Sequence, residues 1–207
     1  MDKNVIIELE KYIFEHKTKP IIASHMMADI IGVIIGVKPA TISSFNNEEF
    51  TDVNPDELIE LLDQVGLRIL FFKQIHVDRG EITYIEDIYI SRDTKTAFRL
   101  HQAFEKLHSS MDDMGQILDQ KLWEESSREI GHLLGYPETA VEYYIVEQDV
   151  DNEERQQLMK RYQFYVHSPK NHEQEYQIYD QKIYQALRDY APKTAEILIN
   201  NRNAKMI

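Results

Sequence analysis

The 207-residue chain contains no cysteine. Without thiols it forms no disulfide bond, thiolate metal site or iron–sulfur cluster, and it has no cysteine nucleophile. Glycine and proline are also scarce, with 7 and 6 residues, and they are not gathered into a flexible linker. Since internal repeats and low-complexity tracts are absent as well, we expect a single domain over residues 1–207.

Positive charge and long apolar runs are the other deficits of the chain. It has 23 Lys and Arg against 36 Asp and Glu, a formal net charge of -13. Nucleic acids and anionic membranes are bound largely through positive charge, so we expect neither as a partner. The most apolar run, residues 30–37, is far shorter than the about 20 residues of a membrane span. The first 17 residues carry charges throughout and lack the apolar core of a signal peptide, so the expected location is the cytoplasm.

The abundant residues indicate a folded protein that is rich in tyrosine. Hydrophobic residues make up 43% and charged residues 29% of the chain, which is typical of globular proteins. There are 12 tyrosines and a single tryptophan. Because tyrosine combines an apolar ring with a polar hydroxyl, this bias favours partly wet grooves and interfaces.

The order of the expected elements indicates an α+β fold. Two strand patterns, LRILFFKQIHV and EITYIEDIYI, predict a hairpin over residues 67–90. The run ATISSF predicts a short strand before it, whereas residues 24–36 suit either a helix or a strand. Helical apolar spacing is found over residues 94–110 and after several start signals: Asp2, Asn54, Ser126, Pro137, Ser168 and Pro192. We therefore expect a small mixed or antiparallel sheet around a central hairpin, covered by several helices, with a helical extension from about residue 168.

One face of the helix over residues 94–110 carries a candidate metal site. His101, Glu105 and His108 are spaced by four and three residues, which places them on the same side of a helix. Two imidazoles and a carboxylate are suitable ligands for a divalent metal such as zinc. The alternative is that these residues form ordinary side-chain pairs at the helix surface.

No recognised catalytic motif accompanies these residues. The chain contains no G-x-S-x-G elbow and no glycine-rich phosphate-binding loop. His76 and Asp78 lie two residues apart in a predicted strand and therefore share a face, where they would suit a base and its orienting group. A structural role at the end of the hairpin is the preferred interpretation.

Residues 126–145 have the outline of a helix-turn-helix motif. Ser126 and Glu129 fit a capping box, Gly135 fits the turn, and Pro137 opens the second helix. That second helix, PETAVEYYIVEQD, has several acidic residues and neither Lys nor Arg, which disfavours contact with a phosphate-lined groove. A packed helical corner is the alternative.

The stretch REIGHLLGYPETAVEYYI is similar to a Glu-Ile-Gly-x-x-Leu-Gly-Tyr-Pro motif of a bacterial family that carries a domain of unknown function. In that family a Gly-x-Lys-Pro-Ala segment lies upstream and precedes a strand, and this chain has Gly36-Val37-Lys38-Pro39-Ala40 before ATISSF. A central hairpin and an aromatic-rich segment after the motif also fit, so the resemblance covers most of residues 20–185. It implies no activity, cofactor or catalytic residue.

The corner Gly135-Tyr136-Pro137 predicts a sharp reversal of the chain. An apolar helical stripe ends just before Gly135, and Pro137 favours the start of a new helix. Glycine adopts the left-handed conformation that such a corner requires, so we expect Gly135 to have a positive φ. We expect Tyr136 to pack its ring against the corner.

Three functional hypotheses are compatible with these patterns. The leading one is an accessory cytoplasmic protein that binds a protein partner or a small ligand through a tyrosine-rich groove. The second is a metal-dependent enzyme that uses His101, Glu105 and His108, with a divalent metal as cofactor. The third is a transcriptional regulator that uses residues 126–145.

Overall fold

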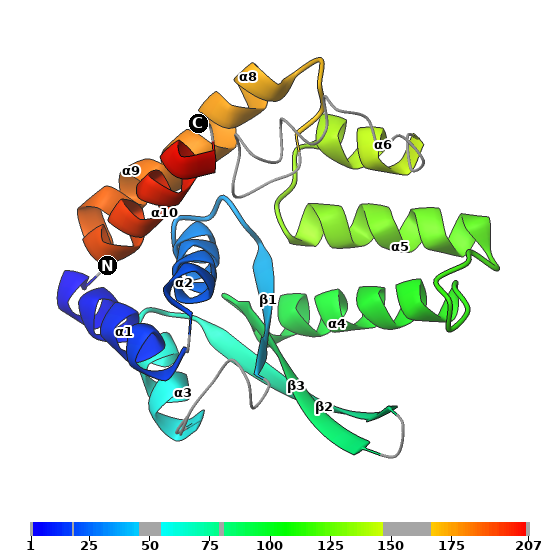
Figure 1. Cartoon of the computed structure of the whole chain (residues 1–207), viewed down its shortest axis with the longest axis horizontal. Helices are drawn as coiled ribbons and strands as arrows, with labels where there is room; N and C mark the ends of the chain where they lie inside the picture. The colour runs from blue at the N-terminus through cyan, green and yellow to red at the C-terminus, as the bar shows by residue number, and fades with distance from the viewer. Residues whose placement is uncertain (1, 18, 46–54, 79–80, 147–166, 206–207) are drawn as a thin grey trace.

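A three-stranded antiparallel sheet lies in the middle of the molecule (Figure 1). Its order is β1-β3-β2, with bounds Ala40–Phe45 for β1, Arg68–Asp78 for β2 and Glu81–Ser91 for β3. The computed structural model describes residues 2–17, 19–45, 55–78, 81–146 and 167–205. Strands β2 and β3 pair from Arg68 opposite Ser91 to Asp78 opposite Glu81, which confirms the predicted hairpin.

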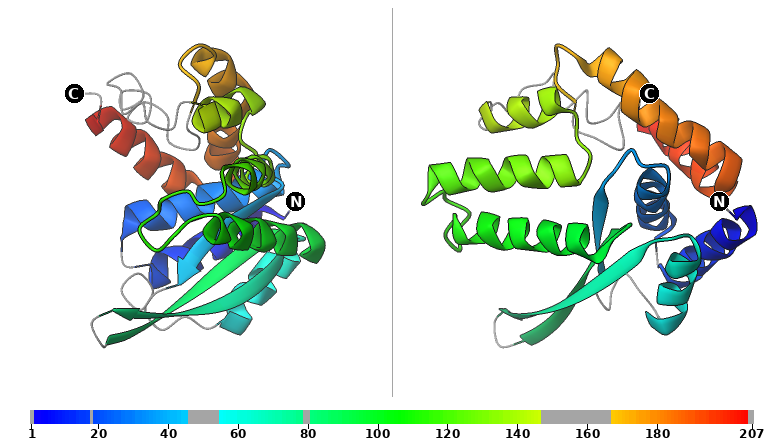
Figure 2. Two further views of the ribbon diagram at one scale, coloured as in Figure 1. Left: turned by 90° about the vertical axis from the view of Figure 1, so that its right-hand side faces the viewer. Right: turned by 180° about the vertical axis from the view of Figure 1, so that it is seen from behind.

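Helices cover both faces of this sheet (Figure 2). Side chains alternate between the faces of a strand, and both sides of β3 are buried. Ile88 and Ile90 enter a large core, whereas Tyr89 enters a smaller one and is 1% exposed. The large core is formed with α1 (Lys3–His16), α2 (Pro20–Ile34) and α3 (Pro55–Gln64), and the smaller core with α4 (Thr94–Ser109) and α5 (Gln120–Leu133). The predicted α+β class, with helices over a small antiparallel sheet, is confirmed.

The first two helices follow from local signals. Asp2 caps α1 and accepts a hydrogen bond from the Asn4 amide at 2.9 Å, and the predicted apolar stripe is buried. Residues 24–34, which suited either a helix or a strand, belong to α2 because Pro20 starts a helix that continues to Ile34.

The start of α5 differs from the prediction. Asp119, not Ser126, is the N-cap, and its side chain accepts from the Leu122 amide at 3.0 Å. Ser126 lies inside the helix, where its hydroxyl donates to the carbonyl of Leu122 at 2.7 Å. The Ser126–Glu129 capping box is therefore wrong, because an acceptor further upstream already satisfies the first free amides.

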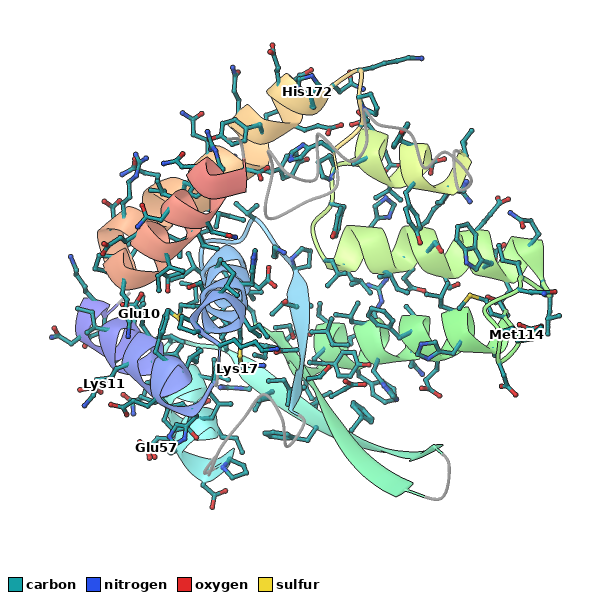
Figure 3. All side chains as sticks on the ribbon, viewed as in Figure 1. Glu10, Lys11, Lys17, Glu57, Met114 and His172 are labelled. Atoms are coloured by element: carbon teal, nitrogen blue, oxygen red, sulfur yellow. The ribbon has the colours of Figure 1, made fainter. Side chains whose placement is uncertain are left out.

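The C-terminal helices pack onto the N-terminal ones. After α6 (Glu138–Val146), one helical rod comprises α8 (His172–Glu175), a π-helical segment η1 (Tyr176–Asp180) and α9 (Gln181–Tyr190). The chain then reverses into α10 (Pro192–Lys205), and both helices contribute side chains to the large core. The rod begins at His172 and not at the predicted Ser168, because residues 168–171 form a turn in which the Asn171 amide donates to the Ser168 carbonyl at 3.1 Å (Figure 3).

The alternating Tyr162, Phe164 and Val166 of RYQFYVH also predict a strand over residues 161–167, which lies outside the described residues except for His167. Within the described part of the chain, no helix combines the length and the apolar character that crossing a lipid bilayer requires.

Candidate ligand-binding site

The three residues of the predicted metal face all lie on α4, but their surroundings differ. The ring of His101 stacks on Phe72, with centroids 3.5 Å apart and an interplanar angle of 10°. Glu105 and His108 are exposed. Among the described residues no group of three or more His, Asp or Glu side chains is arranged to hold a metal ion. The structure thus places these residues on one helix without bringing them into a metal-binding arrangement.

The side chains of His76 and Asp78 lie outside the described residues. Their backbone belongs to β2, where His76 pairs with Thr83 and Asp78 with Glu81 of β3.

The helix-turn-helix outline corresponds to the end of α5, a corner and α6. Arg128 of α5 forms an ion pair with Glu142 of α6, with Nε 2.7 Å from Oε1, and His132 contacts Glu138. The acidic side chains of the second helix thus hold it to the first. These contacts agree with the packed-corner interpretation.

The corner itself forms as predicted. Gly135 has a φ of 77°, and the helix ends in a Schellman motif in which the Tyr136 amide donates to the Gly131 carbonyl at 2.8 Å. Burial raises the pKa of the Tyr136 hydroxyl to about 12, with a further contribution from the charge of Asp29. The ring of Tyr136 packs against the core, as expected from the sequence.

A second corner of the same kind packs against the first. Gly36 ends α2 with a φ of 77°, and the Val37 amide donates to the Gly32 carbonyl at 3.0 Å. A Cβ added at Gly135 would lie 2.6 Å from the Val37 carbonyl oxygen and 2.9 Å from the Cα of Lys38. The two short motifs that carry the family resemblance therefore meet in space, which neither motif reveals by itself.

A small pocket lies between the C-terminal helices. It has a volume of about 230 Å³, below the about 300–1,000 Å³ that is common for ligand pockets, so it suits a small molecule. Side chains of η1 and α9 form one wall, and side chains of α10 form the other. We call it the tyrosine–arginine pocket, and its lining residues are Tyr176, Gln181, Tyr184, Gln185, Arg188, Ile199, Arg202 and Asn203.

Arg202 is held between the two tyrosines of this pocket. Its guanidinium carbon is 5.8 Å from the ring centroid of Tyr176 and 6.0 Å from that of Tyr184, within cation–π range. Its Nη1 donates to the Tyr176 hydroxyl at 3.1 Å. Its Nε is buried and has no hydrogen-bond partner among the described residues. The guanidinium is thus positioned but keeps an unused donor.

The pocket is positively charged in an acidic protein. Neither Arg188 nor Arg202 forms an ion pair with a carboxylate of the described residues, and no carboxylate lines the pocket. Burial raises the pKa of the Tyr184 hydroxyl to about 12, although the nearby Arg202 opposes this shift. The phenol therefore stays protonated near neutral pH and serves as a hydrogen-bonding group, not as a base.

The pocket walls are fixed by contacts with the N-terminal helices. Glu10 of α1 is buried, and its carboxylate accepts a hydrogen bond from the Thr194 amide in the first turn of α10 at 2.8 Å (Figure 3). A carboxylate at this position satisfies a free amide and complements the helix dipole. Leu198 of α10 and Leu187 of α9 are both fully buried in the large core. The two helices are thus anchored independently of any ligand.

A buried ionic cluster lies immediately before the pocket in the helical rod. His167 is fully buried, with Nδ1 3.0 Å from Glu175 Oε2 and Nε2 2.8 Å from Asp180 Oδ2. Glu175 also accepts hydrogen bonds from the Ser168 amide at 2.9 Å and from the hydroxyls of Ser168 and Thr139. Because both ring nitrogens lie within ion-pair distance of a carboxylate, His167 is a cation that donates from Nδ1 to Glu175 and pairs electrostatically through Nε2 with Asp180.

The ionisation of this cluster follows from its contacts. Burial alone would lower the pKa of His167, but the hydrogen bonds and charges of Asp180 and Glu175 outweigh burial and raise it to about 9. Burial would raise the pKa of Glu175, whereas donation from His167, Thr139 and Ser168 lowers it below its ordinary value. Since the cluster is sealed from solvent, it ties α6, the turn at 168–171 and the helical rod together and does not offer a site for a substrate.

We expect this cluster to make the stability of the protein depend on pH. The pKa of His167 is raised from 6.5 to about 9, so its contribution is complete below about pH 6.5 and is lost as the pH rises through about 9. The pKa of Glu175 is lowered, so its contribution is present above about pH 4.5 and is lost as the pH falls through the lowered value. Urea melts in steps between about pH 5 and about pH 9.5 should show a decline on the alkaline side. A His167→Gln variant should lack this decline, and a wild type without it would contradict the assignment.

A second pocket lies among α4, α5 and α6. It has a volume of about 310 Å³ and includes two tyrosines, Tyr136 and Tyr144, but most of its lining is apolar. We call it the apolar groove. Nothing in its lining provides a charged group to orient a ligand.

The sequence predicted a helical extension from about residue 168 and a tyrosine-rich groove, but the arginines of the pocket were not predicted. Arg188 and Arg202 lie on different helices, and no spacing rule connects them. His167, Glu175 and Asp180 were missed as well, because only a π-helical turn brings the two carboxylates to one side.

Comparisons of the chain with protein-family models, with curated proteins and with solved structures find no match.

Proposed function

We propose that this chain is a non-catalytic cytoplasmic binding protein whose ligand occupies the tyrosine–arginine pocket. The observation that carries the proposal is Arg202, which is held in place by Tyr176 and Tyr184 and retains a buried Nε without a partner among the described residues. Unsatisfied buried donors are rare in folded proteins, and one that lines a pocket favours a missing ligand.

The lining of the pocket favours binding over catalysis. The described residues of its lining contribute amides, phenols and guanidinium groups but no histidine, serine or carboxylate. Its buried phenol, Tyr184, has a pKa raised to about 12 and does not act as a base near neutral pH. The cytoplasmic part of the proposal is supported by the lack of cysteine.

The tyrosine-rich groove expected from the sequence corresponds best to this pocket. The apolar groove also contains tyrosines but has no charged lining residue. Specific recognition of a small ligand depends on a few fixed polar groups, and the tyrosine–arginine pocket has them on both walls.

A ligand screen with a blocked pocket tests this function. Thermal melts would be recorded with a panel of small polar compounds that includes neutral and charged members. A ligand at about 100 times its Kd stabilises by about 2.7 kcal/mol, which raises the Tm of a protein of this size by several degrees. We expect at least one compound of the panel to raise the Tm of the wild type by several degrees.

The variant Gln181→Trp should abolish that shift, because Gln181 is exposed and its side chain lines the pocket. Lys182→Trp is the matched control, since Lys182 is exposed on the same helix but does not line the pocket. The proposal fails if no compound shifts the Tm, or if the shift persists unchanged in Gln181→Trp.

A further inference from the structure

We propose that the ligand is a small anion whose carboxylate or phosphate group is bound by the guanidinium groups of Arg188 and Arg202. This inference rests on the proposed function and names the class of ligand for the same pocket.

The charge distribution is the first support. The chain has 36 acidic residues against 23 basic ones, yet among the described residues two arginines and no carboxylate line the tyrosine–arginine pocket. Elsewhere in the described residues, arginines are used in ion pairs, as Arg99 with Glu129 and Arg128 with Glu142 show. Arg188 and Arg202 have no such carboxylate partner there. The pocket therefore concentrates positive charge that the fold does not neutralise.

The unused donors of Arg202 are the second support. A guanidinium carries five N–H donors in a fixed planar fork that matches the oxygens of a carboxylate or a phosphate. At Arg202 one N–H donates to the Tyr176 hydroxyl at 3.1 Å and the Tyr184 hydroxyl is a further hydrogen-bonding neighbour, while the buried Nε lacks a protein partner among the described residues. An anionic oxygen would supply a charge-assisted acceptor for this group, which is stronger than a neutral one.

The geometry of the two helices provides the third support. Arg188 is exposed in the last turn of α9, whereas Arg202 is partly buried on α10 and braced by Tyr176 and Tyr184. Rigid positioning lowers the conformational entropy that binding must remove. Arg202 thus provides the preformed part of the site, and the exposed Arg188 closes on the anion from the solvent side. Because Tyr184 remains a neutral phenol, it does not repel the ligand.

Calorimetric titrations with defined probes test this inference. Inorganic phosphate is the phosphate probe, succinate is the carboxylate probe and glycerol is the neutral control. We expect one of the two anions to bind the wild type, and the preferred anion identifies the group that the pocket recognises. Glycerol should not bind.

Two arginine variants and one lysine control locate the binding. Arg188→Gln and Arg202→Gln should each raise the Kd for the anion at least tenfold. The control Lys182→Gln removes an exposed cation of α9 that does not line the pocket, and it should change the Kd by less than twofold. Circular dichroism checks that each variant is folded. If Arg202→Gln does not fold, Arg188→Gln decides the matter because Arg188 is exposed.

Two results would overturn the inference. The first would be that neither anion binds the wild type at about millimolar concentrations. The second would be that the Kd for the anion is unchanged in both arginine variants. If neutral compounds bind and are blocked by Gln181→Trp while neither anion binds, the proposed pocket stands and the anion inference alone is wrong. If nothing binds, both are wrong.

Discussion

Replacing His167 by alanine should lower the free energy of unfolding by about 3–5 kcal/mol, the cost that is usual when one partner of a buried ion pair is removed. His167 is fully buried between Glu175 and Asp180, with nitrogen–oxygen distances of 3.0 and 2.8 Å. The alanine variant leaves two carboxylates buried without their shared cation, and it also leaves a cavity. Urea melts of both proteins at neutral pH measure the difference.

The pH dependence of this loss separates a charge effect from a packing effect. Two buried carboxylates without a cation have raised pKa values, so they take up protons at mildly acidic pH and the cost of burying them falls. The deficit of His167→Ala should therefore shrink between about pH 7 and about pH 5. A deficit that stays constant over this range would mean that the cavity, not the charge, determines the cost.

His108→Ala is a suitable control for the histidine variant. His108 is exposed on α4, and its ring is tilted by 40° from the ring of Phe104, with centroids 6.4 Å apart. We expect a change within about 0.5 kcal/mol, as for most surface substitutions. A loss under about 1 kcal/mol for His167→Ala, similar to that of this control, would show that the buried cluster contributes little to stability.

Replacing Gly135 by alanine should lower the free energy of unfolding by more than about 2 kcal/mol, although alanine favours helices. Two costs add at this position. An L-residue at a φ of 77° costs about 1–2 kcal/mol, and the new Cβ would lie 2.6 Å from the Val37 carbonyl oxygen. The overlapping atom belongs to the backbone of the Gly36 corner, so it cannot move aside as a flexible side chain would.

Gly66→Ala is the matched control for this experiment. Gly66 also has a φ of 77°, but a Cβ added there meets nothing within 4 Å. It should therefore show the conformational cost alone, about 1 kcal/mol, and the difference between the two variants measures the close approach of the two corners. If urea melts show that both variants lose the same free energy of unfolding, the backbone of the Gly36 corner moves to accommodate the added methyl group at little cost.

Local signals accounted for most of the secondary structure. The Asp2 cap, the buried stripe of α1, the hairpin and the left-handed Gly135 were predicted correctly because each depends on residues a few positions apart. The capping box at Ser126 failed for a local reason as well, since Asp119 competes for the same role upstream. The start of the C-terminal rod was misplaced because residues 168–171 form a turn, and the Ser168 hydroxyl donates to the Glu175 carboxylate instead of accepting from the first amides of the helix.

The candidate sites were predicted less well. The helix face of His101, Glu105 and His108 was identified correctly as a face, but periodicity does not reveal that His101 stacks on Phe72 of a distant strand. Metal binding needs ligands that converge from several directions, and a single helix face rarely provides them. The high tyrosine content predicted a groove but did not indicate which residues line it.

By itself the sequence determined the α+β class, the Asp2 cap and the left-handed Gly135, because these follow from side-chain periodicity and from backbone preferences within a few residues. Only the tertiary structure decided which corners meet, which arginines share a pocket and how His167 is enclosed. In an α-helix, five residues advance by about 140° around the axis, so the spacing of Glu175 and Asp180 predicts different faces. The π-helical segment, in which the Gln181 amide bonds to the Tyr176 carbonyl, brings both carboxylates to His167. A period of 3.6 residues per turn does not predict such a segment, so the cluster was visible only in the folded structure.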